Sequence, residues 1–415
     1  MELSGSGTGN GNGTAGNGRD QSESRMGMLR GLGEQAVLES IFGSGPITRP
    51  QIASATGLSK PTVSAAVSRL EQAGLVRAAG TRVGHRGRQP VAYEVNSRAG
   101  FVVGADIGGA NLRVAAADLF GEPICDDQRA TPKDGARSVG EQLLELVTEV
   151  IDEAAGAHGA PLALGVASPG IIDQASGRVT SLAYNVVPEG RFDPADVIRA
   201  RFDIPVIVDN NVNLSAVGEK WFGLARGVST LVFIALGSGV GLGLMVGDEL
   251  LRGAHGAAGE IAYLPLASDP FDPRHRLHGG LEDEIGAAGI VAAYNASRGP
   301  GDSEVASAQE VFERAGGGNG AAHGVVEHVA ARLGEAVGTV CAIVDPELVV
   351  LGGGIGSNRL LLRGVRGAAA ALVPVTARIE TSRLGERAAL QGAVAVALRE
   401  ARMTLLSSGS RQRSL

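Results

Sequence analysis

Three glycine-rich turns follow apolar segments of the sequence and could bring backbone N–H groups close to a phosphate. The apolar segments end at Asp106, Leu236 and Leu351. Consecutive N–H groups in such turns form concave anion sites, although a single glycine pair also fits an ordinary hairpin. Three such turns spread over one region predict a nucleotide cleft between two lobes. The candidate residues of this cleft are Asp106, Gly108, Gly109, Gly237, Ser238, Gly239, Gly353 and Gly354.

Charge points to a second kind of chemistry, because it is distributed unevenly along the chain. Residues 30–100 carry nine Lys or Arg against four Asp or Glu, whereas residues 101–415 carry 26 against 37. The small basic segment therefore predicts a polyanionic partner that the acidic remainder does not share.

Signals within the basic segment predict a helix-turn-helix. Gln35–Phe42 has the apolar spacing of a helix, and Thr48 followed by Gln51 at capping-box spacing begins a second one. Gly57 ends this second helix, and Ser59 begins a third. The third helix would enter the major groove of double-stranded DNA. Its candidate contacts are Ser59, Lys60, Thr62, Ser64, Ser68 and Arg69.

The end of the basic segment predicts a wing. Leu75–Ala78 and Val91–Val95 have the composition of strands, and glycines and arginines separate them. The candidate minor-groove contacts in the wing are Arg82, Arg86 and Arg88. Gln89 departs from the tightest Arg-Gly-Arg-Pro hook, so a preference for A/T tracts is left open. A small basic subdomain that packs on the rest is the alternative, and RNA lacks support because no aromatic platform is present.

Composition divides the chain into four parts. Residues 1–29 are rich in Gly, Ser and Asn and are predicted to be a disordered tail. Residues 30–96 are the winged helix-turn-helix domain; residues 101–402 alternate apolar strands with Ala/Leu/Glu-rich helices, an α/β pattern; and residues 403–415 are a C-terminal tail. The first thirty residues lack an apolar core, the longest apolar stretch is broken by glycines, and the two cysteines are far apart. We therefore expect a cytoplasmic protein without a signal peptide or membrane partner.

A set of motifs in the large domain resembles the repressor, open reading frame, kinase (ROK) family, in the regulator branch with an N-terminal winged helix-turn-helix. The resemblance implies a two-lobed, actin-like (ribonuclease-H-like, sugar-kinase-type) fold and membership among sugar kinases or sugar-responsive transcription factors. The motifs are, in order, Asp106–Gly109, Ser168–Gly170, Val208–Glu219, Gly237–Gly241, Gly256–Ile261, Leu281–Glu282 and Leu351–Gly354.

The resemblance also implies which residues bind sugar and argues against an enzyme. Kinases of the family use an Asp as general base where this chain has Asn211, and an amide cannot take the proton. Their phosphate-loop Thr is replaced by Ala110, although Asp209 leaves a residual role open. The residues that the resemblance places at the sugar are Asn185, Asn210, Asn211, Glu260, Tyr263 and Glu282.

The zinc site of the family is not expected here. That site uses a His and three Cys, but this chain has Tyr263 at the His position and no Cys between Tyr263 and Glu282. Nearby side chains could in principle hold a metal in another way, although an exposed loop rich in Pro and Arg is the favoured explanation. These side chains are His255, Asp269, Asp272, His275 and His278. We expect no metal and no cofactor, and ATP binding is left open.

Together these features predict a sugar-responsive transcriptional regulator, a repressor of carbohydrate-utilisation genes. It would bind double-stranded operator DNA as a homodimer or homotetramer and respond to a sugar or sugar phosphate. One alternative is an ATP-dependent ROK sugar kinase with a regulatory DNA-binding arm. Another is a DNA-binding protein whose large domain only assembles oligomers.

Overall fold

The computed structural model describes residues 32–81, 90–173, 178–181, 193–266, 269–375 and 377–411. The chain divides into two units. The first combines Met1–Ala99 with Ala401–Leu415, and the second is Gly100–Glu400. Among the helices of the described ranges, none is long and apolar enough to cross a membrane.

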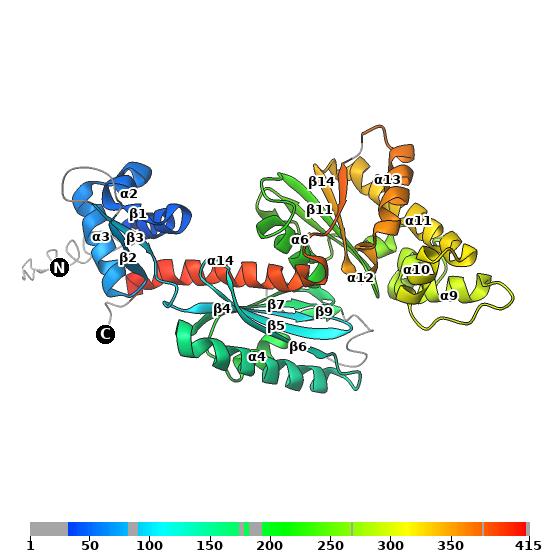
Figure 1. The fold of residues 1–415 in the computed structure, drawn as a ribbon, viewed down its shortest axis with the longest axis horizontal. Helices are drawn as coiled ribbons and strands as arrows, with labels where there is room; N and C mark the ends of the chain where they lie inside the picture. The colour runs from blue at the N-terminus through cyan, green and yellow to red at the C-terminus, as the bar shows by residue number, and fades with distance from the viewer. Residues whose placement is uncertain are drawn as a thin grey trace, which may run out of the picture. The chain divides into compact units, whose positions relative to one another are not determined.

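The first unit contains a helix-turn-helix and a small antiparallel sheet (Figure 1). A helix over residues 32–44 precedes α2 (Arg49–Thr56) and α3 (Lys60–Gln72). The sheet has the order β1-β3-β2, formed by β1 (Ile47–Thr48), β3 (Val91–Val95) and β2 (Val76–Thr81). The predicted helices and the two wing strands are thus confirmed, and β1 is an additional strand.

Local capping explains where these helices begin and end. The backbone N–H of Thr48 donates to Gln51 Oε1 at 3.0 Å, which completes the predicted capping box. Gly57 ends α2 with a left-handed φ of 70°. Ser59 Oγ then accepts a hydrogen bond from the Thr62 N–H at 3.3 Å. The helix-turn-helix is therefore encoded by contacts between residues three or four positions apart.

Two five-stranded sheets form the second unit. The first sheet has the order β10-β7-β4-β5-β6, with β10 (Val206–Asn210), β7 (Pro161–Ser168), β4 (Phe101–Ile107), β5 (Asn111–Asp118) and β6 (Pro123–Ala130). The second has the order β13-β12-β11-β14-β15, with β13 (Glu249–Leu250), β12 (Val240–Val246), β11 (Thr230–Leu236), β14 (Leu348–Gly352) and β15 (Arg378–Thr381). A hairpin of β8 (Ile171–Ile172) and β9 (Val179–Ser181) forms a separate two-stranded sheet. The α/β fold with two lobes matches the prediction.

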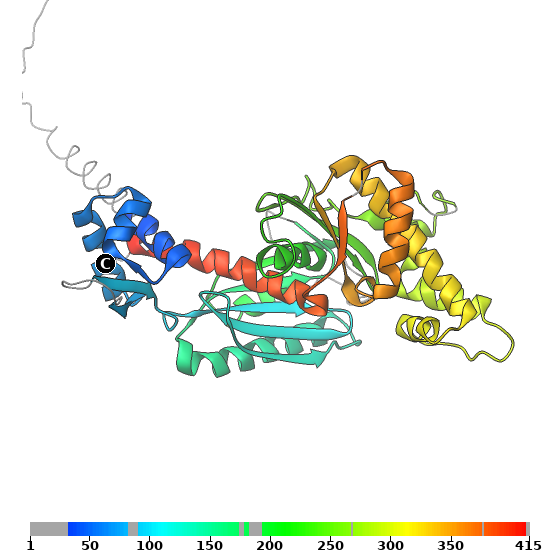
Figure 2. The ribbon, with the colours of Figure 1, turned by 45° about the horizontal axis from the view of Figure 1, so that its top comes forward.

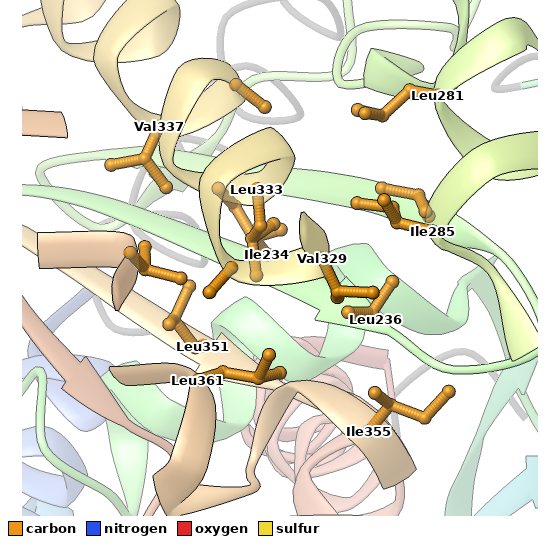
Figure 3. Close-up of a cluster of buried hydrophobic side chains, with 14 of the residues drawn as sticks. Ile234, Leu236, Leu281, Ile285, Val329, Leu333, Val337, Leu351, Ile355 and Leu361 are labelled. Atoms are coloured by element: carbon orange, nitrogen blue, oxygen red, sulfur yellow. The ribbon is translucent and has the colours of Figure 1, made fainter. Parts of the chain in front are cut away.

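Helices cover the second sheet on a large apolar core. α11 (Gly320–Val344) and α13 (Arg359–Leu372) lie side by side (Figure 1 and Figure 2). Figure 3 shows Ile234 of β11, Leu333 of α11 and Leu351 of β14 pointing toward one another within this core. α9 (Ala287–Ser297) and α10 (Ala308–Gly316) extend the same cluster through Ile290 and Phe312.

The first sheet is covered by α4 (Ala136–His158) and by residues 388–400 of α14 (Ala388–Arg411), which Figure 1 shows on opposite faces. α5 (Pro194–Arg199) packs beside β10. A Cβ on Gly165 of β7 would lie 2.1 Å from the carbonyl oxygen of Ala393, so sheet and helix touch backbone to backbone. The C-terminal tail predicted over residues 403–415 is wrong as far as Arg411, because α14 continues to that residue.

α14 also crosses α6 (Asn211–Trp221) closely. A Cβ on Gly392 would lie 1.7 Å from the Leu214 carbonyl oxygen, and one on Gly218 would lie 2.3 Å from that of Ala388. Such distances are too short for any real Cβ, so both positions require glycine. The helix that begins at Asn211 is therefore held against α14 by direct backbone contact.

Candidate functional site

The segment from Asp209 to Asn213 joins the end of β10 to the start of α6. Asn210 caps this helix, because its Oδ1 accepts from the N–H groups of Val212 (2.8 Å) and Asn213 (3.3 Å). Its Nδ2 donates to the Gly170 carbonyl oxygen at 2.8 Å. The Asn210 amide thus ties the Ser168–Gly170 motif to the start of α6.

Asp209 is buried, and both of its carboxylate oxygens are engaged. Oδ1 accepts from the Asn210 N–H at 2.8 Å and from Asn213 Nδ2 at 3.2 Å. Oδ2 accepts from Arg252 Nε at 2.7 Å in an ion pair. This carboxylate therefore holds the segment together, and both of its oxygens are occupied by these bonds, which does not suit a proton acceptor for a substrate.

Asn211 is the first residue of α6, and its side chain is half-buried. Its backbone carbonyl accepts from Ser215 Oγ at 2.8 Å. Within the described ranges, no residue forms a hydrogen bond with its side-chain amide. The amide can both donate to and accept from a hydroxyl group, but it cannot act as a general base near neutral pH.

Two carboxylates converge on the turn between β11 and β12. Glu260 precedes the short helix η1 (Ile261–Tyr263), and Glu282 lies in α8 (Gly280–Ile285). Glu282 Oε2 accepts from the Val240 N–H at 3.0 Å. Burial raises the pKa of the Glu260 carboxyl. Burial also raises the pKa of Glu282, and the charge of Glu260 adds to this, so the two carboxylates feel each other.

The remaining two residues assigned to the sugar site differ from these. Tyr263 is 52 % exposed at the end of η1, a higher exposure than a side chain enclosed around a ligand would have. Asn185 lies outside the described residues. The structure thus brings together two groups, Asn210 with Asn211 and Glu260 with Glu282, and the sugar role of each residue stays a prediction.

Asp106, at the first glycine-rich turn, is a buried carboxyl with incomplete pairing. Arg113 Nη1 lies 3.5 Å from its Oδ2, while Arg113 Nη2 lies 2.6 Å from Glu386. Burial raises the pKa of Asp106 to about 7, and Arg113 opposes this rise. The turn itself is closed by Gly108, whose N–H donates to the Asn111 carbonyl at 3.0 Å, and by Thr131 Oγ1, which donates to the Gly108 carbonyl at 2.6 Å.

The second and third glycine-rich turns adjoin each other. A Cβ on Gly353 would lie 2.4 Å from the Leu236 carbonyl oxygen, and one on Gly237 would lie 3.8 Å from the Gly354 N–H nitrogen. Gly353 also begins the one-turn helix α12 (Gly353–Gly356) with a φ of 79°. The ends of β11 and β14 therefore adjoin each other, and the nucleotide cleft and the binding of ATP there stay predictions.

The loop before α8 is held by polar contacts. His275 Nδ1 of α7 (His275–His278) lies 2.6 Å from Asp283 Oδ2, and Asp272 pairs with Arg274 at 2.5 Å. In the part of the chain that the structure describes, no cluster of three or more His, Cys, Asp or Glu could hold a metal ion. Cys125 and Cys341 are free thiols.

The candidate DNA contacts of α3 separate into two sets. Ser59, Lys60 and Thr62 are exposed at its first turn. Farther along, Arg49 donates to the hydroxyls of Ser64 (3.3 Å) and Ser68 (3.5 Å) and stacks over Tyr93 at 5.0 Å, and Arg69 is ion-paired with Glu34. The wing residues Arg82, Arg86 and Arg88 lie outside the described ranges. Direct DNA contact is thus predicted most simply for the first set.

Two family models match the chain. The ROK family model matches residues 102–400, and the MarR family model matches residues 36–88. The chain belongs to the ROK family. The MarR match lies over the described helix-turn-helix and its wing, so the protein is in the branch of ROK proteins with an N-terminal winged helix.

Individual relatives include both regulators and an enzyme. The ROK protein is 27 % identical to a putative xylose repressor of Caldicellulosiruptor sp. (strain Rt8B.4), over 89 % of this chain and 96 % of that one. A glucokinase of Halalkalibacterium halodurans is 29 % identical over 61 % of this chain and 80 % of its own. The crystal structure of a ROK family transcriptional regulator, a homologue of E. coli MLC protein, has a TM-score of 0.74 at 22 % identity and covers 92 % of this chain and 99 % of that one, which shows a shared fold.

Several residues that shape these sites were not found by sequence reasoning. Arg252, Arg113 and Arg49 each neutralise or cross-link groups that are distant in the sequence. No local pattern marks an arginine of this kind. His278 was considered only as a metal ligand, but its Nδ1 lies 3.8 Å from Glu282 Oε1, and the i, i+4 spacing of these two residues was a usable signal.

Proposed function

We propose that this ROK protein is a sugar-responsive transcriptional repressor of carbohydrate-utilisation genes and has no kinase activity. The observation that carries the proposal is the state of Asp209 and Asn211. The carboxylate of Asp209 is committed to Arg252 and Asn213, and the neighbouring side chain that can meet a sugar hydroxyl is an amide. Such a site can recognise a polyol but lacks a base for phosphoryl transfer.

The DNA-binding unit supplies the output of the proposed switch. An exposed first turn of α3 in a basic unit fits insertion into the major groove. A homodimer would present two such helices to the half-sites of a pseudo-palindromic operator. Because relatives include a putative xylose repressor, xylose is the first effector to test.

The direct test measures binding of the full-length protein to DNA upstream of its own gene by fluorescence anisotropy. We expect binding that weakens steeply with salt and is released by a sugar. Binding that no sugar in a broad panel changes would refute the sugar response. Equal affinities for the upstream DNA and for unrelated DNA would refute specific operator recognition.

Kinase activity is the second candidate, favoured by the three glycine-rich turns and by the similarity to a glucokinase. A coupled ADP-release assay over the same sugars decides it. We expect no turnover above the protein-free rate. Turnover that disappears in Asn211→Ala would make the protein an enzyme and overturn the non-catalytic part of the proposal.

Lys60→Ala tests the DNA contact assigned to α3. Lys60 is exposed at the first turn, so we expect a loss of operator affinity of roughly tenfold and a salt slope smaller by about one. Glu71→Ala, an exposed charge near the end of the same helix, is the control and should not weaken binding. Equal affinities for Lys60→Ala and the unchanged protein would remove Lys60 from the interface.

A further inference from the structure

We infer that the effector is an uncharged sugar rather than a sugar phosphate, and that His278 is an additional contact to it, beside Glu282. The inference rests on the proposed sugar response and narrows it to one ligand class. It starts from the charges around the converging carboxylates, Glu260 and Glu282, and from the elements that hold them.

Two arginines of the neighbouring motifs, Arg252 and Arg113, are already paired. Arg252 Nε lies 2.7 Å from Asp209, and Arg113 is shared between Asp106 at 3.5 Å and Glu386 at 2.6 Å. To bind either guanidinium, a phosphate would have to displace a carboxylate. At each arginine one of the paired carboxylates is buried: Asp209 at Arg252 and Asp106 at Arg113. That exchange leaves a buried carboxylate without its partner, which is strongly unfavourable.

The carboxylates themselves oppose an anion. Glu260 and Glu282 are both largely buried, and each raises the electrostatic cost of a further negative charge nearby. Among the described residues, the cationic group that acts on Glu282 is the imidazole of His278. A phosphate near Glu282 would therefore meet the repulsion of two carboxylates, with the imidazole of His278 as the described group that opposes it.

Three short elements converge on the same point and place His278 there. Gly279, which joins α7 to α8, has a φ of 85°, and a Cβ at this residue would lie 2.3 Å from the Ala262 carbonyl oxygen. The junction is thereby pressed against η1, which begins next to Glu260. The side chains of His278 and Glu282 are 35 % and 20 % exposed, so a ligand can reach both.

This arrangement suits a hydroxyl group. A sugar hydroxyl can donate to a carboxylate oxygen of Glu282 and accept from a ring N–H of His278 at the same time. The Oε2 atom of Glu282 is already bonded to the Val240 N–H, which fixes the carboxylate and leaves its Oε1 atom facing His278. Glu282, held by the Val240 N–H, therefore offers an acceptor, and the neighbouring His278 ring offers a donor.

The test compares matched ligand pairs on the full-length protein by isothermal titration calorimetry. The pairs are xylose and xylose 5-phosphate, glucose and glucose 6-phosphate, and N-acetylglucosamine and its 6-phosphate. For the pair that binds, we expect the uncharged member to bind at least about a hundredfold more tightly. Tighter binding of a phosphate overturns this inference and leaves the sugar response intact. Binding of no member by the protein, with no effect on DNA, removes both.

Variants assign the contact to His278. His278→Ala should weaken binding of the uncharged sugar about tenfold or more, whereas His275→Gln, on the same short helix but bonded to Asp283, should leave it within about twofold. Glu282→Gln should weaken the uncharged sugar and strengthen the phosphate, so the two ligands move in opposite directions. His278→Ala with unchanged affinity and an unchanged melting temperature would exclude His278 as a contact.

Discussion

Asp106 and Asp209 are two buried aspartates near the ends of β4 and β10, two strands of the same sheet, and each faces one arginine. Asp209 accepts three hydrogen bonds, with Arg252 at 2.7 Å. Asp106 has Arg113 at 3.5 Å, shared with Glu386, and burial raises its pKa to about 7. The difference shows that an arginine nearby does not by itself offset burial: at Asp106 the guanidinium is more distant and shared, and the pKa of the carboxyl rises.

The largest effect should come from breaking the ion pair between Asp209 and Arg252. Arg252→Ala leaves the Asp209 carboxylate buried without its cation, so we expect the free energy of unfolding to fall by about 3–5 kcal/mol. Urea denaturation of the full chain measures this. Arg252→Lys keeps the charge and should lose less. A loss under about 1 kcal/mol for Arg252→Ala would mean that the two sites differ less than their geometry indicates.

The less well paired aspartate, Asp106, should instead affect how the free energy of unfolding depends on pH. Because the folded pKa of Asp106, about 7, lies above the ordinary value of 3.8, the folded protein holds a proton that the unfolded chain releases. The free energy of unfolding should therefore decline as pH rises from about 4 through 7. Asp106→Asn should remove roughly 3–4 kcal/mol of that decline.

The control for Asp106→Asn is Asp126→Asn, an exposed aspartate of the same lobe that is paired with Arg387. This variant should leave the slope of stability against pH unchanged. If Asp106→Asn also leaves the slope unchanged, Asp106 is as well satisfied as Asp209.

The smallest effect concerns the turn next to Asp106. Thr131 is buried, and its hydroxyl donates to the Gly108 carbonyl at 2.6 Å. Thr131→Val keeps the shape and removes the donor, so we expect a loss of about 1–2 kcal/mol. Thr131→Ser retains the hydroxyl and should recover part of this. An unchanged melting temperature for Thr131→Val would show that the turn is held by its backbone alone.

The sequence predicted the parts of the molecule that depend on near neighbours. The Thr48 capping box, the Gly57 C-cap and the Ser59 N-cap each join residues three or four positions apart, and all are present. The alternation of apolar strands and glycine-rich turns likewise predicted β4, β11 and β14. Short-range hydrogen bonds and hydrophobic periodicity leave a mark on composition that can be read without the fold.

The partners of the charged residues could not be predicted in this way. Arg252 is 43 positions from Asp209, and Arg113 is 273 positions from Glu386. Only the strand order brings such pairs together. The sequence therefore left Asp209 open as a residual base, whereas in the structure its carboxylate is bonded to Arg252 and Asn213. The same reason explains why the bonds that Ser64 and Ser68 accept from Arg49 across the two helices were missed; the DNA contact assigned to these two serines stays a prediction.

The division of the chain into Met1–Ala99 with Ala401–Leu415 and Gly100–Glu400 has a practical consequence for dissection of the protein. The polypeptide passes between the units twice, so the first unit consists of two separate stretches and both ends of the second unit continue into the first. A fragment that stops at Ala99 lacks Arg402, which stacks over Phe42 at 4.8 Å. One proteolytic cut between Ala99 and Gly100 would still leave the units covalently attached through α14.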